Sequence, residues 1–384
     1  MEQTFLTDIT IKKVRHLENI SIPLDKDKRK HLILTGKNGS GKTSILEALA
    51  GYFQYFVLPE SKKREEQHLL EYYKKLTDIL KGDVNPVFTS SVLLLEKYKQ
   101  GKFIFAYYKA ERELQVEIYR NIEKVELKEQ YSIAENPGIK FTKYLVDLKA
   151  TQAFTKDKEK AEKIDQWFHV FEDMLKRIFE DENLQLKFND ETFQFSICES
   201  GREPFDFNTM SSGYAAIFDI INDLIIRMEA QSGLRTEFDM EGIVLVDEIE
   251  THLHLELQKK ILPILTTLFP NIQFIITTHS PFILSSLDNA VIYDLQNRTL
   301  VENGLENLPY EGIVEGYFKA DTLSAELREK FERYKDLVSK DELSDEEYEE
   351  IDKLEFYLDE IPDYLAKELT SEYSRLKLEF SNRG

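Results

Sequence analysis

The sequence predicts an α/β fold built on a largely parallel sheet and followed by a helical region. Residues 31–35 form a short apolar run that leads into a glycine-rich loop, and residues 44–50 then have helical spacing. Between residues 243 and 301, apolar strand patterns alternate with a helix at 254–267, and such alternation is typical of parallel sheets. From about residue 311 onward the pattern is helical only.

The glycine-rich loop is the most informative motif. Residues 36–43 read Gly-Lys-Asn-Gly-Ser-Gly-Lys-Thr, the pattern of a phosphate-binding P-loop between a strand and a helix. Its backbone amides and the positive end of the helix would face a triphosphate. Lys42 would bridge the β- and γ-phosphates, and Thr43 would coordinate Mg²⁺. The predicted ATP-binding residues of this loop are Asn38, Gly39, Ser40, Gly41, Lys42, Thr43 and Ser44.

Composition predicts a soluble cytoplasmic protein. The apolar fraction of 42% supports a real core, and there is no run of about 18 uncharged apolar residues, so no membrane-spanning helix is expected. The first residues lack the basic and apolar regions of a secretory signal. The single cysteine, Cys198, cannot form an internal disulfide and fits a reducing compartment.

Charge argues against a surface that binds nucleic acid as a whole. The net charge is −21, which repels nucleic acid at long range. Residues 341–363 contain twelve Asp or Glu against one basic residue, Lys353. Because this segment carries about half of the excess acid, the remainder is only moderately acidic, and a local basic groove stays compatible with the composition.

The other elements are expected as follows. Strands are predicted at 5–11, 17–22, 91–95, 103–108, 184–188, 192–197, 290–294 and 299–301, a turn at 83–86, and helices at 61–82, 141–154, 158–179 and 210–230. The predicted organisation is one domain over residues 1–310, with helical insertions at about 59–83 and 140–181. Residues 311–384 form an acidic helical region that would make oligomer or partner contacts.

A second motif follows the apolar strand at residues 243–246. The strand ends in Asp247 and Glu248, which is the form of a Walker B motif. Asp247 would hold Mg²⁺ through water, and Glu248 would orient and activate the water that attacks the γ-phosphate. The next residues, 249–254, occupy the place of a loop that contacts a second subunit.

A third motif is a histidine at the end of another strand. A strand is predicted at 273–277, with apolar residues at 274–276, and it leads to His279, thirty-one residues beyond Glu248. Ligands bind outside the carboxyl ends of strands in open parallel sheets, so this imidazole could hydrogen-bond the γ-phosphate. With His252 and His254 it could also suggest a metal cluster, but no cysteine or ligand spacing supports one.

A fourth motif precedes the helix predicted at 210–230. Residues 210–214 read Met-Ser-Ser-Gly-Tyr, and small residues at a helix start form an anion-binding N-terminus. This stretch resembles the signature loop of ABC-type ATPases, in which Leu-Ser-Gly-Gly-Gln is usual. Ser211 and Gly213 match that pattern, whereas Met210, Ser212 and Tyr214 depart from it.

Together the four motifs resemble the RecF/SMC/OLD-like branch of ABC-type ATPases, the AAA15/AAA21 group that includes phage-defence ATPases. The resemblance covers about residues 1–305 and implies a P-loop NTPase fold, with an ABC-type head and a mixed sheet. It also implies that ATP is sandwiched between two heads, so that Ser211, Ser212 and Gly213 of one chain face the P-loop of another. A homodimer or a higher oligomer is therefore expected.

The resemblance further implies a glutamine that contacts Mg²⁺ and the γ-phosphate. Gln152, in the predicted helical insertion, is the candidate, and an ordinary glutamine on the helix surface is an equal alternative. Arg112 follows the strand at 103–108. A surface ion pair with Glu111 or Glu113 is expected for it rather than a phosphate contact.

Segment lengths separate the members of this group. An insertion of about forty residues is too short for the coiled-coil arm of SMC and Rad50-type proteins. Residues 311–384 are too few and too helical for the Toprim domain of OLD nucleases. Nothing beyond the shared motifs suggests a membrane partner.

Two functional classes remain. The first is an ATPase that controls a separate effector from a neighbouring gene. The resemblance to the ATPase subunits of the Septu and PARIS defence systems implies this class. The second is a RecF-like clamp that grips DNA. The acidic charge favours the first class, whereas a basic stripe at Lys12, Lys13 and Arg15, or at residues 156–163, would favour the second.

Overall fold

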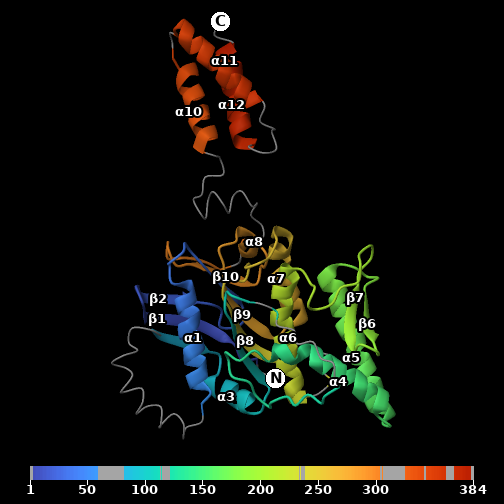
Figure 1. The fold of residues 1–384 in the computed structure, drawn as a ribbon. Coiled ribbons are helices and arrows are strands. Elements are labelled where there is room, and N and C mark those ends of the chain that lie inside the picture. The colour runs from blue at the N-terminus through green and yellow to red at the C-terminus, as the bar shows by residue number, and fades with distance from the viewer. Residues whose placement is uncertain are drawn as a thin grey trace. The chain divides into compact units, whose positions relative to one another are not determined.

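The computed structural model (Figure 1) describes residues 3–58, 82–112, 114, 122–232, 234, 238–302, 305, 325–340, 343–359 and 367–381. The helix predicted at 61–82 lies outside these ranges. The chain divides into two compact units, residues 1–308 and 309–384. Over the described residues, no helix combines the length and apolar character needed to cross a membrane.

A six-stranded mixed sheet forms the centre of the first unit. In sheet order its strands are β11 (Thr299–Val301), β10 (Ala290–Asp294), β3 (His31–Thr35), β9 (Ile272–Thr277), β8 (Glu241–Val246) and β5 (Phe103–Tyr108). All neighbours are parallel except β11, which pairs antiparallel with β10. The last residues of neighbouring strands are in register, as in the pairs Tyr108 with Val246 and Asp294 with Thr35. Five strands therefore end at one edge, and the predicted α/β class is confirmed.

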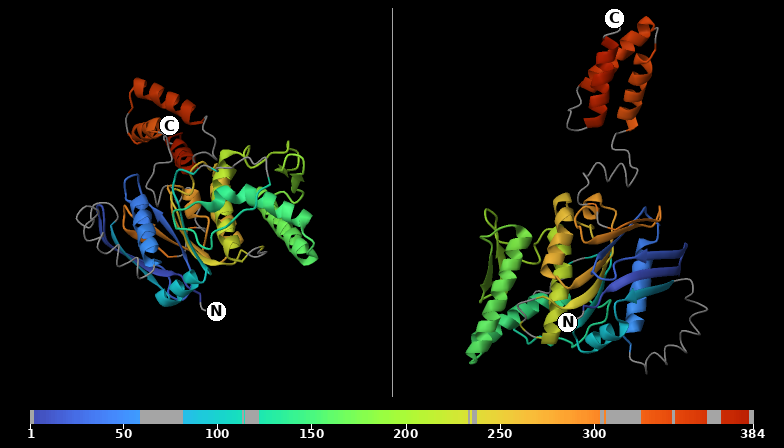
Figure 2. Two further views of the ribbon diagram at one scale, coloured as in Figure 1. Left: turned by 60° about the horizontal axis from the view of Figure 1, so that its bottom comes forward. Right: turned by 180° about the vertical axis from the view of Figure 1, so that it is seen from behind.

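Helix α1 (Lys42–Phe56) lies between this sheet and a second one. The second sheet has the order β2 (Leu17–Pro23), β1 (Leu6–Val14) and β4 (Asp83–Phe88), all antiparallel. Ile45 and Leu49 of α1 share a hydrophobic core with Ile9 of β1 and Leu245 of β8. Because α1 is buried on both sides, the loop that precedes it is fixed between the two sheets (Figures 1 and 2).

Two helices cover the other face of the six-stranded sheet, and the helical insertion packs against them. The insertion contains η1 (Pro137–Lys140), α4 (Phe141–Phe154), α5 (Lys158–Phe179) and the hairpin β6 (Gln185–Asn189) and β7 (Gln194–Cys198). Helix α5 begins where the Asp157 side chain accepts a hydrogen bond from the amide of Lys160, and it buries Trp167 and Phe171. The helices α6 (Ser212–Ser232), α7 (Leu255–Leu268) and α8 (Pro281–Leu284) follow. Figures 1 and 2 show α6 and α7 on the opposite side of β8 and β9 from α1.

Two local predictions are wrong. The apolar run at 91–95 belongs to helix α3 (Ser91–Lys99), because the Ser90 hydroxyl caps the helix by accepting a hydrogen bond from the amide of Leu93. The turn predicted at 83–86 is instead the first part of strand β4, which pairs with β1. Pro86 is compatible with this strand because β4 lies at the edge of its sheet.

The second unit contains α10 (Ala325–Val338), α11 (Asp345–Asp359) and α12 (Lys367–Ser381). Their shared apolar core consists of Phe331, Tyr334, Leu337, Val338, Ile351, Leu358 and Tyr373. Ion pairs connect the helices, including Arg333 with Glu350 at 2.8 Å and Lys377 with Asp359 at 2.7 Å. The three helices therefore have a core of their own.

Candidate nucleotide site

The carboxyl edge of the six-stranded sheet collects three of the four predicted motifs. Strand β3 leads into the loop at 36–43, β8 ends before Asp247 and Glu248, and β9 ends before His279. The neighbouring strand β5 ends four residues before Arg112. Because β3, β9, β8 and β5 are parallel and adjacent, these segments converge outside one edge.

The P-loop conformation depends on its glycines. Gly39 and Gly41 have φ values of 81° and 98°, in the left-handed region that favours glycine. A Cβ added at Gly41 would lie 2.6 Å from Cδ1 of Leu17, so the second sheet leaves no room for a side chain there. The loop residues Asn38 and Gly39 are exposed.

Lys42 begins α1 and turns back over the loop. Its Nζ donates to the carbonyl oxygens of Gly36 at 2.9 Å and Lys37 at 3.3 Å, and the residue is only 5% exposed. Burial lowers the pKa of Lys42, while the charges of Glu248 and other nearby carboxylates act in the opposite direction. Of the following residues, Thr43 is exposed and Ser44 is buried.

The turn after β8 is held by hydrogen bonds from both neighbouring strands. Asp247 is 2% exposed, and its Oδ1 accepts a bond from the Thr277 hydroxyl at 2.5 Å. The amide of Glu248 donates to the same hydroxyl oxygen at 2.7 Å, and the amide of Asp247 donates to the carbonyl of Tyr108 at 2.8 Å. Glu248 has a φ of 42°, which is rare for a residue with a side chain. Its conformation is therefore imposed by its surroundings.

His279 lies beside Glu250, which the sequence did not single out. The backbone amide of His279 donates to Glu250 Oε1. Burial lowers the pKa of His279, and the positive charge of Lys42 acts in the same direction, which favours the neutral imidazole. Its Nε2 atom and Glu250 Oε2 are both buried without a protein partner, as is Ser40 Oγ in the P-loop.

These unpartnered atoms test whether the site fits a nucleotide with Mg²⁺. Buried polar groups are normally hydrogen-bonded, so atoms left over at the mouth of a P-loop indicate partners from outside the chain. Ser40 Oγ and His279 Nε2 are suited to phosphate oxygens, and the Asp247 carboxylate and the Thr43 hydroxyl are oxygen ligands of the kind that Mg²⁺ prefers. The residues present therefore fit the predicted ligands.

Arg112 is not the surface residue that the sequence predicted. It is 5% exposed, and its guanidinium donates to the carbonyls of Asp247 at 2.6 Å, Glu248 at 2.9 Å and Ile249 at 3.3 Å. The pairing of β5 with β8 brings Arg112 under the turn, which the local sequence could not reveal. The available signal was its position four residues beyond an apolar strand, at the sheet edge that also holds Asp247. Thr277, the last residue of β9, was missed as well.

The signature stretch lies at the beginning of α6. Ser211 and Ser212 are exposed and Gly213 is buried. A Cβ added at Gly213 would lie 3.1 Å from Cδ1 of Leu257 and 3.3 Å from the carbonyl oxygen of His252. The start of α6 therefore packs against the segment that follows the Asp247 turn and presents two hydroxyls to solvent.

Gln152 lies in the helical insertion. Its Oε1 accepts a bond from Lys149 Nζ at 3.0 Å, and its Nε2 donates to Asp165 Oδ1 at 3.0 Å. Helix α4, which carries it, is separate from the beginning of α1 in each view (Figures 1 and 2). These contacts do not bring Gln152 to the P-loop, and its role at Mg²⁺ stays a prediction.

Comparison with known proteins agrees with the resemblance in the motifs. Residues 134–285 match the family model described as "AAA domain, putative AbiEii toxin, Type IV TA system". The Septu protein PtuA of Bacillus mycoides is 27% identical over 386 residues, covering 92% of this chain and 50% of PtuA. The retron Ec83 probable ATPase of Escherichia coli is 40% identical over 89 residues, covering 23% of this chain and 16% of that protein.

Two further similarities lie in the RecF and SMC branches. The DNA replication and repair protein RecF of Rickettsia prowazekii is 35% identical over 82 residues, covering 21% of this chain and 22% of RecF. An SMC head bound to the C-terminal winged-helix domain of ScpA has a TM-score of 0.42 at 14% identity, covering 79% of this chain and 99% of that one. The chain spans half or less of the length of these curated relatives. The predicted resemblance to ABC-type ATPases like those of Septu and retron systems is confirmed.

Proposed function

We propose that this protein is an ABC/OLD-like ATPase that assembles around ATP and controls a separate effector in anti-phage defence. The observation that carries the proposal is the convergence of the P-loop, the Asp247–Glu248 turn and His279 at one sheet edge, with polar atoms left unpaired there. The similarity to Septu PtuA and to a retron probable ATPase supports the biological setting.

Hydrolysis follows from the roles that this geometry allows. The amides of loop 36–43 and the ammonium of Lys42 bind the phosphates of ATP, and His279 Nε2 hydrogen-bonds the γ-phosphate. Thr43 and Asp247 would hold Mg²⁺, which neutralises the phosphate charge. The carboxylate of Glu248 orients the attacking water and takes up its proton. Since phosphoryl transfer needs mainly positioning and charge stabilisation, these groups supply the part of the chemistry that one copy can provide.

Assembly would complete the site. The exposed hydroxyls of Ser211 and Ser212 lie at the N-terminus of a 21-residue helix, where an anion is favoured. In an ATP-bound homodimer or higher oligomer, this end of α6 and Gly213 would face the γ-phosphate on the P-loop of the other copy. Each copy would then hydrolyse ATP only when paired.

Charge pairing supports an effector rather than DNA as the partner. Lys12 and Lys13, two of the basic residues whose stripe would favour a DNA clamp, pair with Asp83 at 3.5 Å and Glu18 at 2.9 Å. Lys163 likewise pairs with Glu159 at 2.7 Å. These pairs reduce the positive field that a DNA clamp requires. The similarity to RecF keeps a DNA-clamp ATPase as the second candidate.

The acidic C-terminal helices are the proposed contact region for the effector or for other copies. Helix α11 exposes Tyr348 and Phe356, 51% and 71% exposed, among the acids of residues 345–359. An aromatic surface surrounded by carboxylates suits a partner with basic and apolar groups. A cytoplasmic location accords with this proposal.

The test is the mass of purified Glu248→Gln protein in ATP and Mg²⁺, with and without duplex DNA and with proteins from neighbouring genes. Glu248→Gln should bind ATP and stay assembled, because hydrolysis no longer releases the interface, and it should retain a neighbouring protein without DNA. Lys42→Ala, which removes the phosphate contact, is the control and should remain unassembled. Assembly only on DNA, with no protein partner, would favour the clamp instead.

A further inference from the structure

We infer that Arg112 is a positioning residue for Glu248, and that it connects the Asp247–Glu248 turn to the helix that begins at the signature stretch. The inference deepens the proposed function and rests on it. Arg112 lies beneath the turn, and its hydrogen bonds to the turn all go to backbone carbonyls, so it acts through Glu248 and not on ATP.

Arg112 contacts the turn through several donors at once. The guanidinium of Arg112 donates to three consecutive carbonyls, those of residues 247, 248 and 249, and also to the carbonyl of Lys109 at 2.9 Å in its own loop. A planar fork with several donors can hold successive carbonyls at once, whereas a lysine ammonium has no such fixed geometry. The contact therefore determines the orientation of the turn as well as its position.

The backbone conformation of the turn at Glu248 has to be held by its surroundings. Glu248 has a φ of 42°, and a side chain in this region persists only where the surrounding structure holds it. The amides of residues 247, 248 and 249 are bound by Tyr108 and Thr277 of the flanking strands. Arg112 binds the carbonyls of the same three residues. Loss of Arg112 would free the side of the turn that the strands do not hold.

The segment that carries Arg112 is also connected to helix α6. Asp219, two turns into α6 and 6% exposed, accepts a hydrogen bond from Asn136 at 3.0 Å, and its charge acts on Arg112 more strongly than that of any other carboxylate. One turn further, Asp223 accepts a bond from the hydroxyl of Tyr108 at 2.5 Å. Tyr108 thus bonds to α6 through its hydroxyl and to the turn through its carbonyl oxygen, and Arg112 follows it by four residues.

This arrangement gives the signature helix a route to the catalytic turn. If the partner copy's nucleotide binds at the start of α6, a shift of that helix would act on residues 108–112 and, through Arg112, on the backbone of Glu248. The route consists of contacts within one chain, so it operates in each copy of an assembly.

Arg227 provides a matched control. Its guanidinium is also buried, pairs with Asp223 at 2.7 Å and donates to the carbonyls of Phe105, Ser132 and Glu135. None of these carbonyls belongs to the turn after β8. Arg112→Lys and Arg227→Lys therefore both replace a buried arginine on backbone carbonyls. Arg227→Lys keeps a positive charge beside Asp223, whereas Arg112→Lys removes donors from the carbonyls of residues 247–249.

The experiment compares these variants in the full chain. Arg112→Lys should lower kcat by about 10²-fold, as expected for a misplaced catalytic group, with the Kd for a non-hydrolysable ATP analogue within about three-fold of wild type. Hydrogen exchange at the amides of residues 247–249 should become faster, while exchange in the P-loop stays unchanged. Arg227→Lys should show neither effect. For Arg112→Ala, added guanidinium should restore part of the lost rate.

Three results would overturn the inference: equal losses of kcat in the two lysine variants, a parallel loss of ATP affinity, or unchanged exchange at residues 247–249. If Arg112→Lys does not fold, Arg112→Gln, which keeps one amide donor, is measured in the same way. If the wild-type protein hydrolyses no ATP, the proposed function fails, and the exchange measurement still tests whether Arg112 holds the turn.

Discussion

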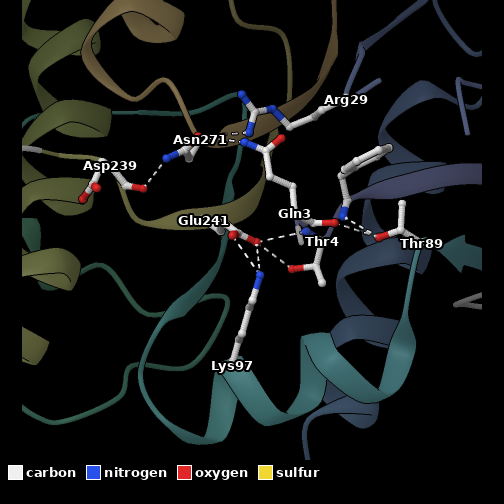
Figure 3. A network of polar contacts seen from close by, with 9 residues as sticks. Gln3, Thr4, Arg29, Thr89, Lys97, Asp239, Glu241 and Asn271 are labelled. Carbon is white, nitrogen blue, oxygen red and sulfur yellow. Dashed lines mark hydrogen bonds and ion pairs between the residues drawn. The ribbon is translucent and has the colours of Figure 1, made fainter. Parts of the chain in front are cut away.

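The two edges of the six-stranded sheet differ in how completely their polar groups are paired. At the amino edge, Glu241 begins β8 and accepts hydrogen bonds from Lys97 at 2.8 and 2.9 Å and from the amide and hydroxyl of Thr4 (Figure 3). At the carboxyl edge, the same strand is followed by Asp247 and Glu248, beside polar atoms that have no protein partner. Acidic residues thus lie at both ends of β8. They differ in whether the polar groups around them are paired within the protein.

The difference indicates which edge is reserved for a ligand. Around Glu241, Asn271 also bonds to Arg29 and to the carbonyl of Asp239, and Arg29 Nε is the one buried atom of this group without a partner (Figure 3). At the other edge Ser40 Oγ, Glu250 Oε2 and His279 Nε2 are all unpaired. Saturated pairing stabilises the fold, whereas unpaired buried groups cost stability and are retained where a ligand can pair with them.

The largest expected effect is at the carboxyl edge. His279→Ala should lower kcat by about 10²–10³-fold, since it removes a neutral donor aimed at the γ-phosphate. The free energy of unfolding should change little, because Nε2 has no partner within the chain. Steady-state hydrolysis and urea denaturation measure the two quantities. A large loss of stability with unchanged hydrolysis would reverse the roles assigned to the two edges.

The amino edge should respond in the opposite way. Glu241→Gln removes the carboxylate that pairs with the buried ammonium of Lys97 and should lower the free energy of unfolding by about 3 kcal/mol. The kcat of the folded fraction should stay within two- to three-fold of wild type, as no residue of this edge reaches the P-loop in the contacts described. Thermal unfolding and hydrolysis at a temperature where both proteins are folded would measure the contrast.

The same pair has a defined pH dependence. Burial raises the pKa of Glu241, but its bonds to Lys97 and Thr4 outweigh this, and the pKa is lowered overall. The contribution of Glu241 to stability is thus complete above its ordinary pKa and is lost as the pH falls through the lowered value. Glu241→Gln should remove this acid-dependent part of the unfolding curve.

The sequence predicts the ligand-facing residues of the carboxyl edge better than the residues that hold them in place. The P-loop, Asp247, Glu248 and His279 are each marked by a strand and the few residues after it, so local pattern suffices. Arg112, Glu250 and Thr277 gain their roles only when β5, β8 and β9 lie side by side, and the order of strands in a sheet is a tertiary property.

The errors have the same origin. The run at 91–95 is apolar enough for a strand or a helix, and the cap at Ser90 makes it helical. Residues 83–86 have the composition of a turn, but pairing with β1 overrides it and extends the chain as β4. The local sequence pattern thus identifies candidate site residues at strand ends more reliably than it assigns the secondary structure of short segments between the strands.

The smallest expected effect concerns Asp219, which belongs to the supports of the carboxyl edge. Burial raises the pKa of Asp219 to about 6, and the hydrogen bond from Asn136 only partly opposes this. The folded protein therefore favours the protonated carboxyl. This contribution to stability is complete below the ordinary pKa of 3.8 and is lost as the pH rises through about 6.

Asp219→Asn stays neutral at every pH, and its amide oxygen can still accept the bond from Asn136. At pH 8 the variant should be more stable than wild type by about 2–3 kcal/mol, and the difference should shrink toward zero as the pH falls to about 4. Urea denaturation across this range measures it. Its kcat should fall several-fold at pH 8, because Arg112 loses the negative charge that acts on it most strongly. A variant less stable than wild type at pH 8 would mean that the charge of Asp219 stabilises the fold, as that of Glu241 does at the other edge. The charge would then not be a destabilising feature kept for the site.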